Sequence, residues 1–125
     1  HRERDEMRSL ERNKRTLHYA VYLGEEPLLD DQGFETGESV PTYGEIIELR
    51  CNISAASGEE AVEAFGSFSQ YTRAVCVSDN NCPLAENSIV WFGIPTSEPY
   101  NYIVTLKADS KNGIMYALQE VKVRV

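Results

Sequence analysis

Residues 45–55, which read EIIELRCNISA, decide the fold class. Apolar side chains occupy every second position of this stretch, and polar or charged ones lie between them: Ile47, Leu49, Cys51 and Ile53 alternate with Glu48, Arg50, Asn52 and Ser54. Because successive side chains of a β-strand point to opposite faces, the alternation predicts a strand with one buried face.

Further strands are predicted on both sides of this segment, at residues 16–23, 71–77, 88–92, 102–107 and 115–125. One short helix is predicted between Ser57, which can cap its start with Glu60 as box partner, and Gly66, which ends it. Short strands without a βαβ rhythm predict a mainly β fold, a small antiparallel β-barrel or sandwich with one short helix.

Residues 25–38 predict a hairpin that projects from the body. Asp30, Asp31, Gln32 and Gly33 suit its turn, and Phe34 leads back into the second strand. Residues 1–15 are dense in charge and predict an extended N-terminal arm, while residues 16–125 form a single β-rich domain. The basic residues Arg8, Arg12, Lys14 and Arg15 make this arm a candidate for docking on an acidic partner, although a solvated tail explains them as well.

The net charge of -8 is unevenly distributed along the 125 residues. Residues 1–15 carry six basic and four acidic groups, a net of +2, which leaves -10 for the rest of the chain. An acidic body repels phosphate, so we expect no tight binding to nucleic acid. The longest apolar run is too short for a membrane span, and the start of the chain lacks a hydrophobic signal segment, so we expect reduced thiols in a cytosolic setting.

Catalytic and metal-binding patterns are absent from the sequence. The only histidines are His1 and His18, and no nucleophile or phosphate-binding motif accompanies them. The acidic turn fails as a calcium loop, since Pro41 stands where the twelfth-position glutamate would be. We therefore expect a protein that is not an enzyme and uses no cofactor.

Four stretches carry a resemblance to a known family. They are residues 13–20 with 24–27, residues 49–54 with 58–59 and 65–66, residues 81–91, and residues 99–104. In these stretches the chain resembles the small head-tail connector proteins of tailed bacteriophages, the head-closure or head-tail joining group.

The resemblance implies a structural virion protein, located in the neck between capsid and tail and assembled in the host cytoplasm. It implies a homo-oligomeric ring, usually twelvefold, that binds the portal protein or an adaptor, closes the DNA channel and offers the tail-completion protein an attachment surface. Packaged DNA would pass without sequence-specific binding, and no membrane is involved. Asp30, Asp31, Gln32, Gly33 and Glu35 would then form a channel-lining or plugging hairpin.

Two alternatives remain open at this stage. A tail-completion or tail-terminator protein is also a β-rich ring former. An acidic, monomeric module that binds a basic peptide or protein would share the same charge distribution.

Overall fold

A computed structural model describes residues 14–55, 59–68, 70–110 and 113–121 of the chain. This part is mainly β, as predicted, and its sheet is antiparallel throughout. Its elements in chain order are β1 (Arg15–Leu29), β2 (Glu35–Ala55), α2 (Glu59–Phe65), β3 (Arg73–Val77), β4 (Ile89–Trp91), β5 (Tyr102–Ser110) and β6 (Gly113–Glu120).

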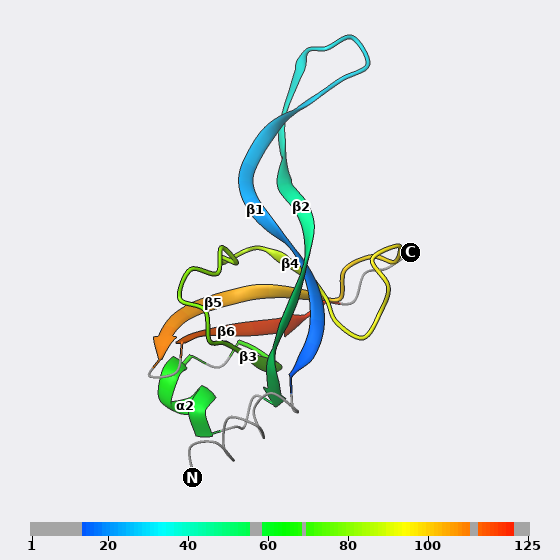
Figure 1. The fold of residues 1–125 in the computed structure, drawn as a ribbon. Coiled ribbons are helices and arrows are strands. Elements are labelled where there is room, and N and C mark those ends of the chain that lie inside the picture. The colour runs from blue at the N-terminus through cyan, green and yellow to red at the C-terminus, as the bar shows by residue number, and fades with distance from the viewer. Residues whose placement is uncertain (1–13, 56–58, 69, 111–112, 122–125) are drawn as a thin grey trace, which may run out of the picture.

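The six strands close into a barrel in the order β1-β2-β3-β6-β5-β4. Closure depends on three residue pairs between β1 and β4, from His18↔Trp91 to Ala20↔Ile89. Because β4 completes the ring, the described part of the barrel has no open sheet edge. The unpaired edges belong to β1 and β2, which continue together well beyond the barrel (Figure 1).

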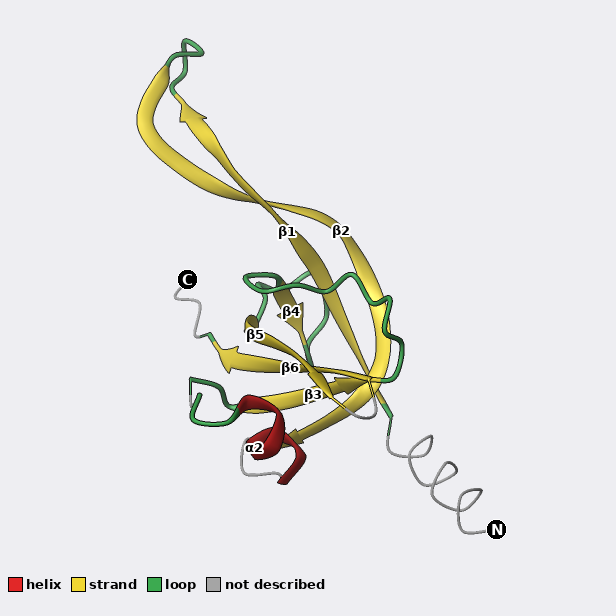
Figure 2. Cartoon of the chain, turned by 90° about the vertical axis from the view of Figure 1, so that its left-hand side faces the viewer, coloured by secondary structure: helices red, strands yellow, loops and turns green. Residues whose placement is uncertain are grey.

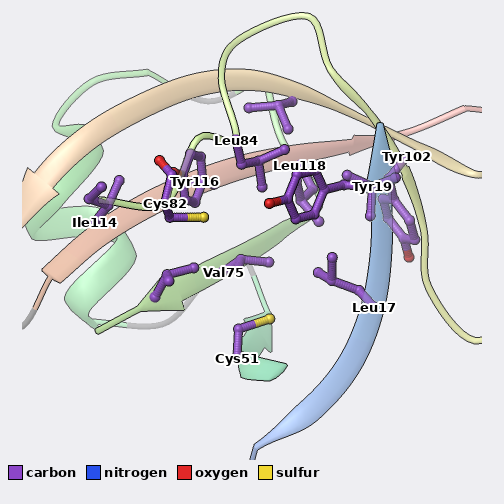
Figure 3. Close-up of a cluster of buried hydrophobic side chains, with 13 residues drawn as sticks. Leu17, Tyr19, Cys51, Val75, Cys82, Leu84, Tyr102, Ile114, Tyr116 and Leu118 are labelled. Atoms are coloured by element: carbon purple, nitrogen blue, oxygen red, sulfur yellow. The ribbon is translucent and has the colours of Figure 1, made fainter. Parts of the chain in front are cut away.

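The barrel interior is a single apolar core to which every strand contributes (Figure 3). The side chains that are fully enclosed include Leu17, Val75, Val90, Val104 and Leu118, each 0% exposed. The residues between them point outward. The alternation in the sequence therefore corresponds to strands in the barrel wall, with one face toward the core and the other toward the outside. In β2 this burial is graded: Cys51 is buried, whereas Ile47 is 40% exposed because the strand is leaving the barrel there.

Helix α2 covers part of the outer wall and gives β6 a second buried face. Ala61 and Phe65 of the helix pack in one cluster with the outward-pointing Met115 and Ala117 of β6. The inward residues of β6 lie in the barrel core, so residues 113–118 are all buried. Gly66 follows the helix at φ 58°, consistent with the predicted stop.

Several predicted boundaries need correction. Arg15, which we assigned to the arm, is the first residue of β1 and pairs with Cys51. The last strand begins at Gly113 and ends at Glu120, earlier at both ends than residues 115–125. Arg8, Arg12 and the Ser57 cap lie outside the described residues.

Candidate interaction surface

The hairpin extension, residues 21–44, is the part of β1 and β2 that lies beyond the last pair between β1 and β4 (Figures 1 and 2). The two strands stay paired from Tyr22↔Tyr43 to Leu29↔Glu35. Nine residues of β1, 21–29, rise about 3.3 Å each, so the extension reaches about 30 Å from the barrel. Neither face of its outer part is covered by another described element, since residues 25–41 are all exposed.

Asp30 builds the turn at the tip. Its Oδ1 accepts hydrogen bonds from the amides of Gln32 at 2.9 Å and Phe34 at 3.0 Å. The Asp30 carbonyl also accepts the amide of Gly33, whose φ of 87° favours glycine. The local sequence therefore closes the hairpin by itself, and Asp30 has a structural role in the turn.

Ser88 attaches the base of the extension to the barrel. Its side chain is fully buried, and its hydroxyl accepts the backbone amide of Tyr22 at 3.0 Å. Tyr22 lies between two register shifts of the β1–β2 ladder. Pairing between β1 and β4 ends at Ala20↔Ile89, and the Ser88 hydroxyl then binds the next part of β1 through the Tyr22 amide.

Aromatic side chains support the same base. The rings of Tyr22 and Tyr43 meet edge to face at 6.1 Å between centroids. Tyr43 and Tyr100 also pack against the buried cluster on the outside of β1 and β4, and Trp91 in that cluster donates from Nε1 to the Glu98 carbonyl at 2.7 Å. Burial, with the neighbouring tyrosines and Glu25, raises the pKa of Tyr43. These contacts fix how the extension leaves the barrel.

Carboxylates dominate the extension. Residues 21–44 contain six acidic side chains and no lysine, arginine or histidine: Glu25, Glu26, Asp30, Asp31, Glu35 and Glu38. Four of them, the glutamates, line one open groove together with Pro27, Gly37 and Ser39. Glu25 is held there by the Ser39 hydroxyl, which donates to its Oε2 at 2.6 Å. The extension is thus a concentrated negative surface.

Apolar side chains are exposed alongside these charges. Phe34 is 68% exposed, Leu23 65% and Leu29 54%. Leu28 and Val40 are also exposed. Large apolar groups that are exposed along an element with no cover from the other described elements are typical of a surface that binds a partner.

The predicted hairpin residues Asp30, Asp31, Gln32, Gly33 and Glu35 do lie together, at or beside the tip. Sequence reasoning missed the second half of the acidic surface, Glu25, Glu26 and Glu38. The signal that could have found it is the 34-residue interval 16–49, which holds eight carboxylates and no lysine or arginine. Sequence reasoning also missed Ser88, because its partner lies 66 positions away.

Two reactive side chains, Cys51 and Tyr116, are part of the barrel core. Cys51, at 1% exposed, has its pKa raised to about 12, chiefly by burial and further by Cys82 and Cys76. Burial and the contact with Cys82 likewise raise the pKa of Tyr116. Within the described ranges no three histidine, cysteine or acidic side chains are placed to hold a metal ion.

No protein-family model, no curated protein and no solved structure significantly matches this chain. Among the helices of the described part, none combines the length and apolar character needed to cross a membrane.

Proposed function

We propose that this chain is a non-enzymatic structural protein that assembles with other protein chains through its hairpin extension. The observation that carries this proposal is the extension itself, about 30 Å of two-stranded sheet with exposed apolar and acidic side chains on both faces. Two-stranded hairpins are marginally stable in water, and a partner that covers one face would remove this weakness.

Within that class we propose a head-closure protein of a phage head-tail connector, a ring subunit beneath the portal. A barrel held by its own core can serve as the body of such a subunit, and the extension can reach a neighbour or the channel. In the channel the carboxylates of Asp31 and Glu35 would repel DNA phosphates over about one Debye length, roughly 8 Å at physiological salt. Repulsion of this kind lets DNA pass without adhering to the wall.

Static light scattering tests the proposal with the chain alone and mixed with portal rings from the phage that encodes it. The proposal predicts that the mixture gains the mass of a ring of this chain on each portal ring. A tail-completion protein would instead add mass to tail tubes, and a monomeric binding module would add mass to neither.

A shortened variant separates the extension from the barrel in the same assay. Gly24 and Thr42 face one another in the ladder, so a two-residue Asn-Gly turn can replace residues 25–41. We expect this variant to keep the cooperative melting of the barrel and to lose binding to the portal ring. Unchanged binding would refute a role for the extension.

A further inference from the structure

We infer that the hairpin extension binds a basic segment of a different protein chain, and that a lysine or arginine of this segment lies in the open groove. The inference names the kind of partner that the proposed assembly surface takes, so it rests on the proposed function. It follows from the side chains that share one face of the extension and from the hollow that Gly37 leaves among them.

One face of the extension carries the groove. Paired residues of neighbouring strands point to the same side of a sheet, and so do alternate residues of one strand. By this rule one face carries two carboxylates together with small and apolar groups: Glu25, Pro27, Leu29, Glu35, Ser39 and Pro41. Four of these residues line the groove, namely Glu25, Pro27, Glu35 and Ser39. The groove therefore follows this face.

Gly37 leaves a hollow in the groove. Its φ of 86° favours glycine, and a Cβ at this position would meet no atom within 4 Å, so the space above it is open. The groove has a volume of about 320 Å³. Ligand pockets begin at roughly 300 Å³, so this space suits a side chain that enters from another protein.

Lysine and arginine match the groove in two ways, because each has an apolar stem and a cationic end. The stem can pack on Pro27 and Leu29, and the carboxylates of Glu25 and Glu35 on the same face can bind the cationic end. The Ser39 hydroxyl donates to Oε2 of Glu25 at 2.6 Å and so orients this carboxylate, which can accept further hydrogen bonds.

A second copy of this chain is a poor partner for this face. The chain has a net charge of -8, and its described ranges contain sixteen acidic side chains against five lysines and arginines. Lys107, one of the five, lines a pocket with Glu86 and Asp109. Arg50 lies two positions from Glu48, on the same face of β2. Charge complementarity therefore indicates a different chain, whose contacting segment is net basic.

Apolar contacts are needed as well, since exposed ion pairs alone contribute little to binding. Leu29 shares the face with the groove and is 54% exposed, and Phe34 at the turn is 68% exposed. A segment that carries both basic and apolar side chains can bury these groups while its charges select the orientation.

Fluorescence anisotropy of labelled peptides tests the inference on the full chain. The probe repeats Gly-Arg-Leu four times, and two companion peptides carry glutamine or glutamate in place of arginine. We expect the arginine peptide to bind about tenfold more tightly than the glutamine peptide, and the glutamate peptide not to bind up to about 1 mM. Binding of the arginine peptide should weaken in 1 M salt, where the Debye length is about 3 Å.

Two variants test the groove itself. E25Q/E35Q removes two carboxylates of the face and should weaken binding of the arginine peptide about fivefold or more. Gly37→Asn should also weaken it, because the added side chain occupies the hollow at unchanged net charge, and asparagine tolerates a positive φ. E98Q/E120Q is the matched control: it changes net charge as much as E25Q/E35Q, at two exposed sites outside the extension, and should bind like the wild type.

Equal affinity for the arginine and glutamine peptides overturns the inference. So does wild-type affinity in E25Q/E35Q or in Gly37→Asn, or an equal loss of affinity in E98Q/E120Q. Failure of the proposed function looks different: the chain would then add no mass to portal rings, whatever its affinity for the arginine peptide.

Discussion

Replacing Ser88 by alanine should loosen the hairpin extension at the point where it leaves the barrel. The hydroxyl of Ser88 is the acceptor that the structure gives to the Tyr22 amide, at 3.0 Å and with Ser88 fully buried. The backbone of Ser88 bonds elsewhere, to Ala85 and Val104, so the substitution leaves the backbone course intact. The substitution removes the acceptor of one group, the backbone N–H of Tyr22.

The size of the effect follows from that lost acceptor. A donor left unsatisfied away from water costs about 1–3 kcal/mol of folding free energy. For a domain of this size each kcal/mol lowers Tm by about 3–5 °C, so Ser88→Ala should lower Tm by roughly 3–15 °C. Urea unfolding followed through the fluorescence of Trp91, the single tryptophan, measures the free energy directly.

Hydrogen exchange locates the effect. The Tyr22 amide should lose protection in Ser88→Ala by more than amides in the barrel core lose. Thr36→Val is the control. The Thr36 hydroxyl donates to the Leu28 carbonyl and accepts the Glu38 amide, both in an exposed setting, so water replaces these bonds and stability should change by less than about 0.5 kcal/mol. If Ser88→Ala unfolds like the wild type and Tyr22 stays protected, the proposed attachment of the extension is wrong.

Three other outcomes are expected. Gly113→Ala should destabilise the fold by roughly 3 kcal/mol or more in urea titrations, because φ is 135° and an added Cβ would meet the Val77 carbonyl oxygen. The free energy of unfolding, measured by urea titration, should stay constant up to about pH 9 and decrease as the pH rises toward 12. Folding raises the pKa of Cys51 from 9.0 to about 12 and raises the pKa of Tyr116 above 10.0. In this pH range both groups therefore ionise first in the unfolded chain, which favours unfolding. Phe34→Ser should weaken binding to portal rings severalfold without lowering Tm, as judged by static light scattering and thermal melts, since the Phe34 ring is 68% exposed.

Matched variants sharpen these experiments. Gly44→Ala should be nearly neutral, because its φ is not positive and an added Cβ would make only ordinary contact at 3.9 Å. Val62→Ser, on α2 and 54% exposed, should leave binding to portal rings unchanged, whereas Phe34→Ser weakens it. A stability that stays flat between pH 8 and pH 11 would contradict the protonated state assigned to the buried thiol and phenol.

The sequence was informative where local chemistry determines the structure. The alternation in residues 45–55 predicted β2, and the Asp and Gly residues at 30–33 predicted the turn that Asp30 closes through two hydrogen bonds. In each case the residues that determine the structure lie within a few positions of one another, so the local sequence is enough to predict it.

Long-range pairing could not be predicted in this way. Closure through Ala20↔Ile89 joins segments about 70 positions apart, and no local pattern reports it. The length of the hairpin strands was also missed, because Gly24, Pro27 and Pro41 are poor strand formers. Their strand conformation comes from the β1–β2 register, which extends from the barrel through three register shifts to the tip.

Those same poor strand formers indicate how the extension can bind. Its outer edges are unpaired, and long unpaired edges invite indiscriminate strand addition. Pro27 and Pro41 place a residue without an N–H on each strand, and the charges of Glu25 and Glu26 fall on opposite faces. Such features hinder addition of a further strand along the edge but leave the faces available. A partner is therefore expected to contact a face of the extension, through its carboxylates and exposed apolar groups, and not to pair along its edge.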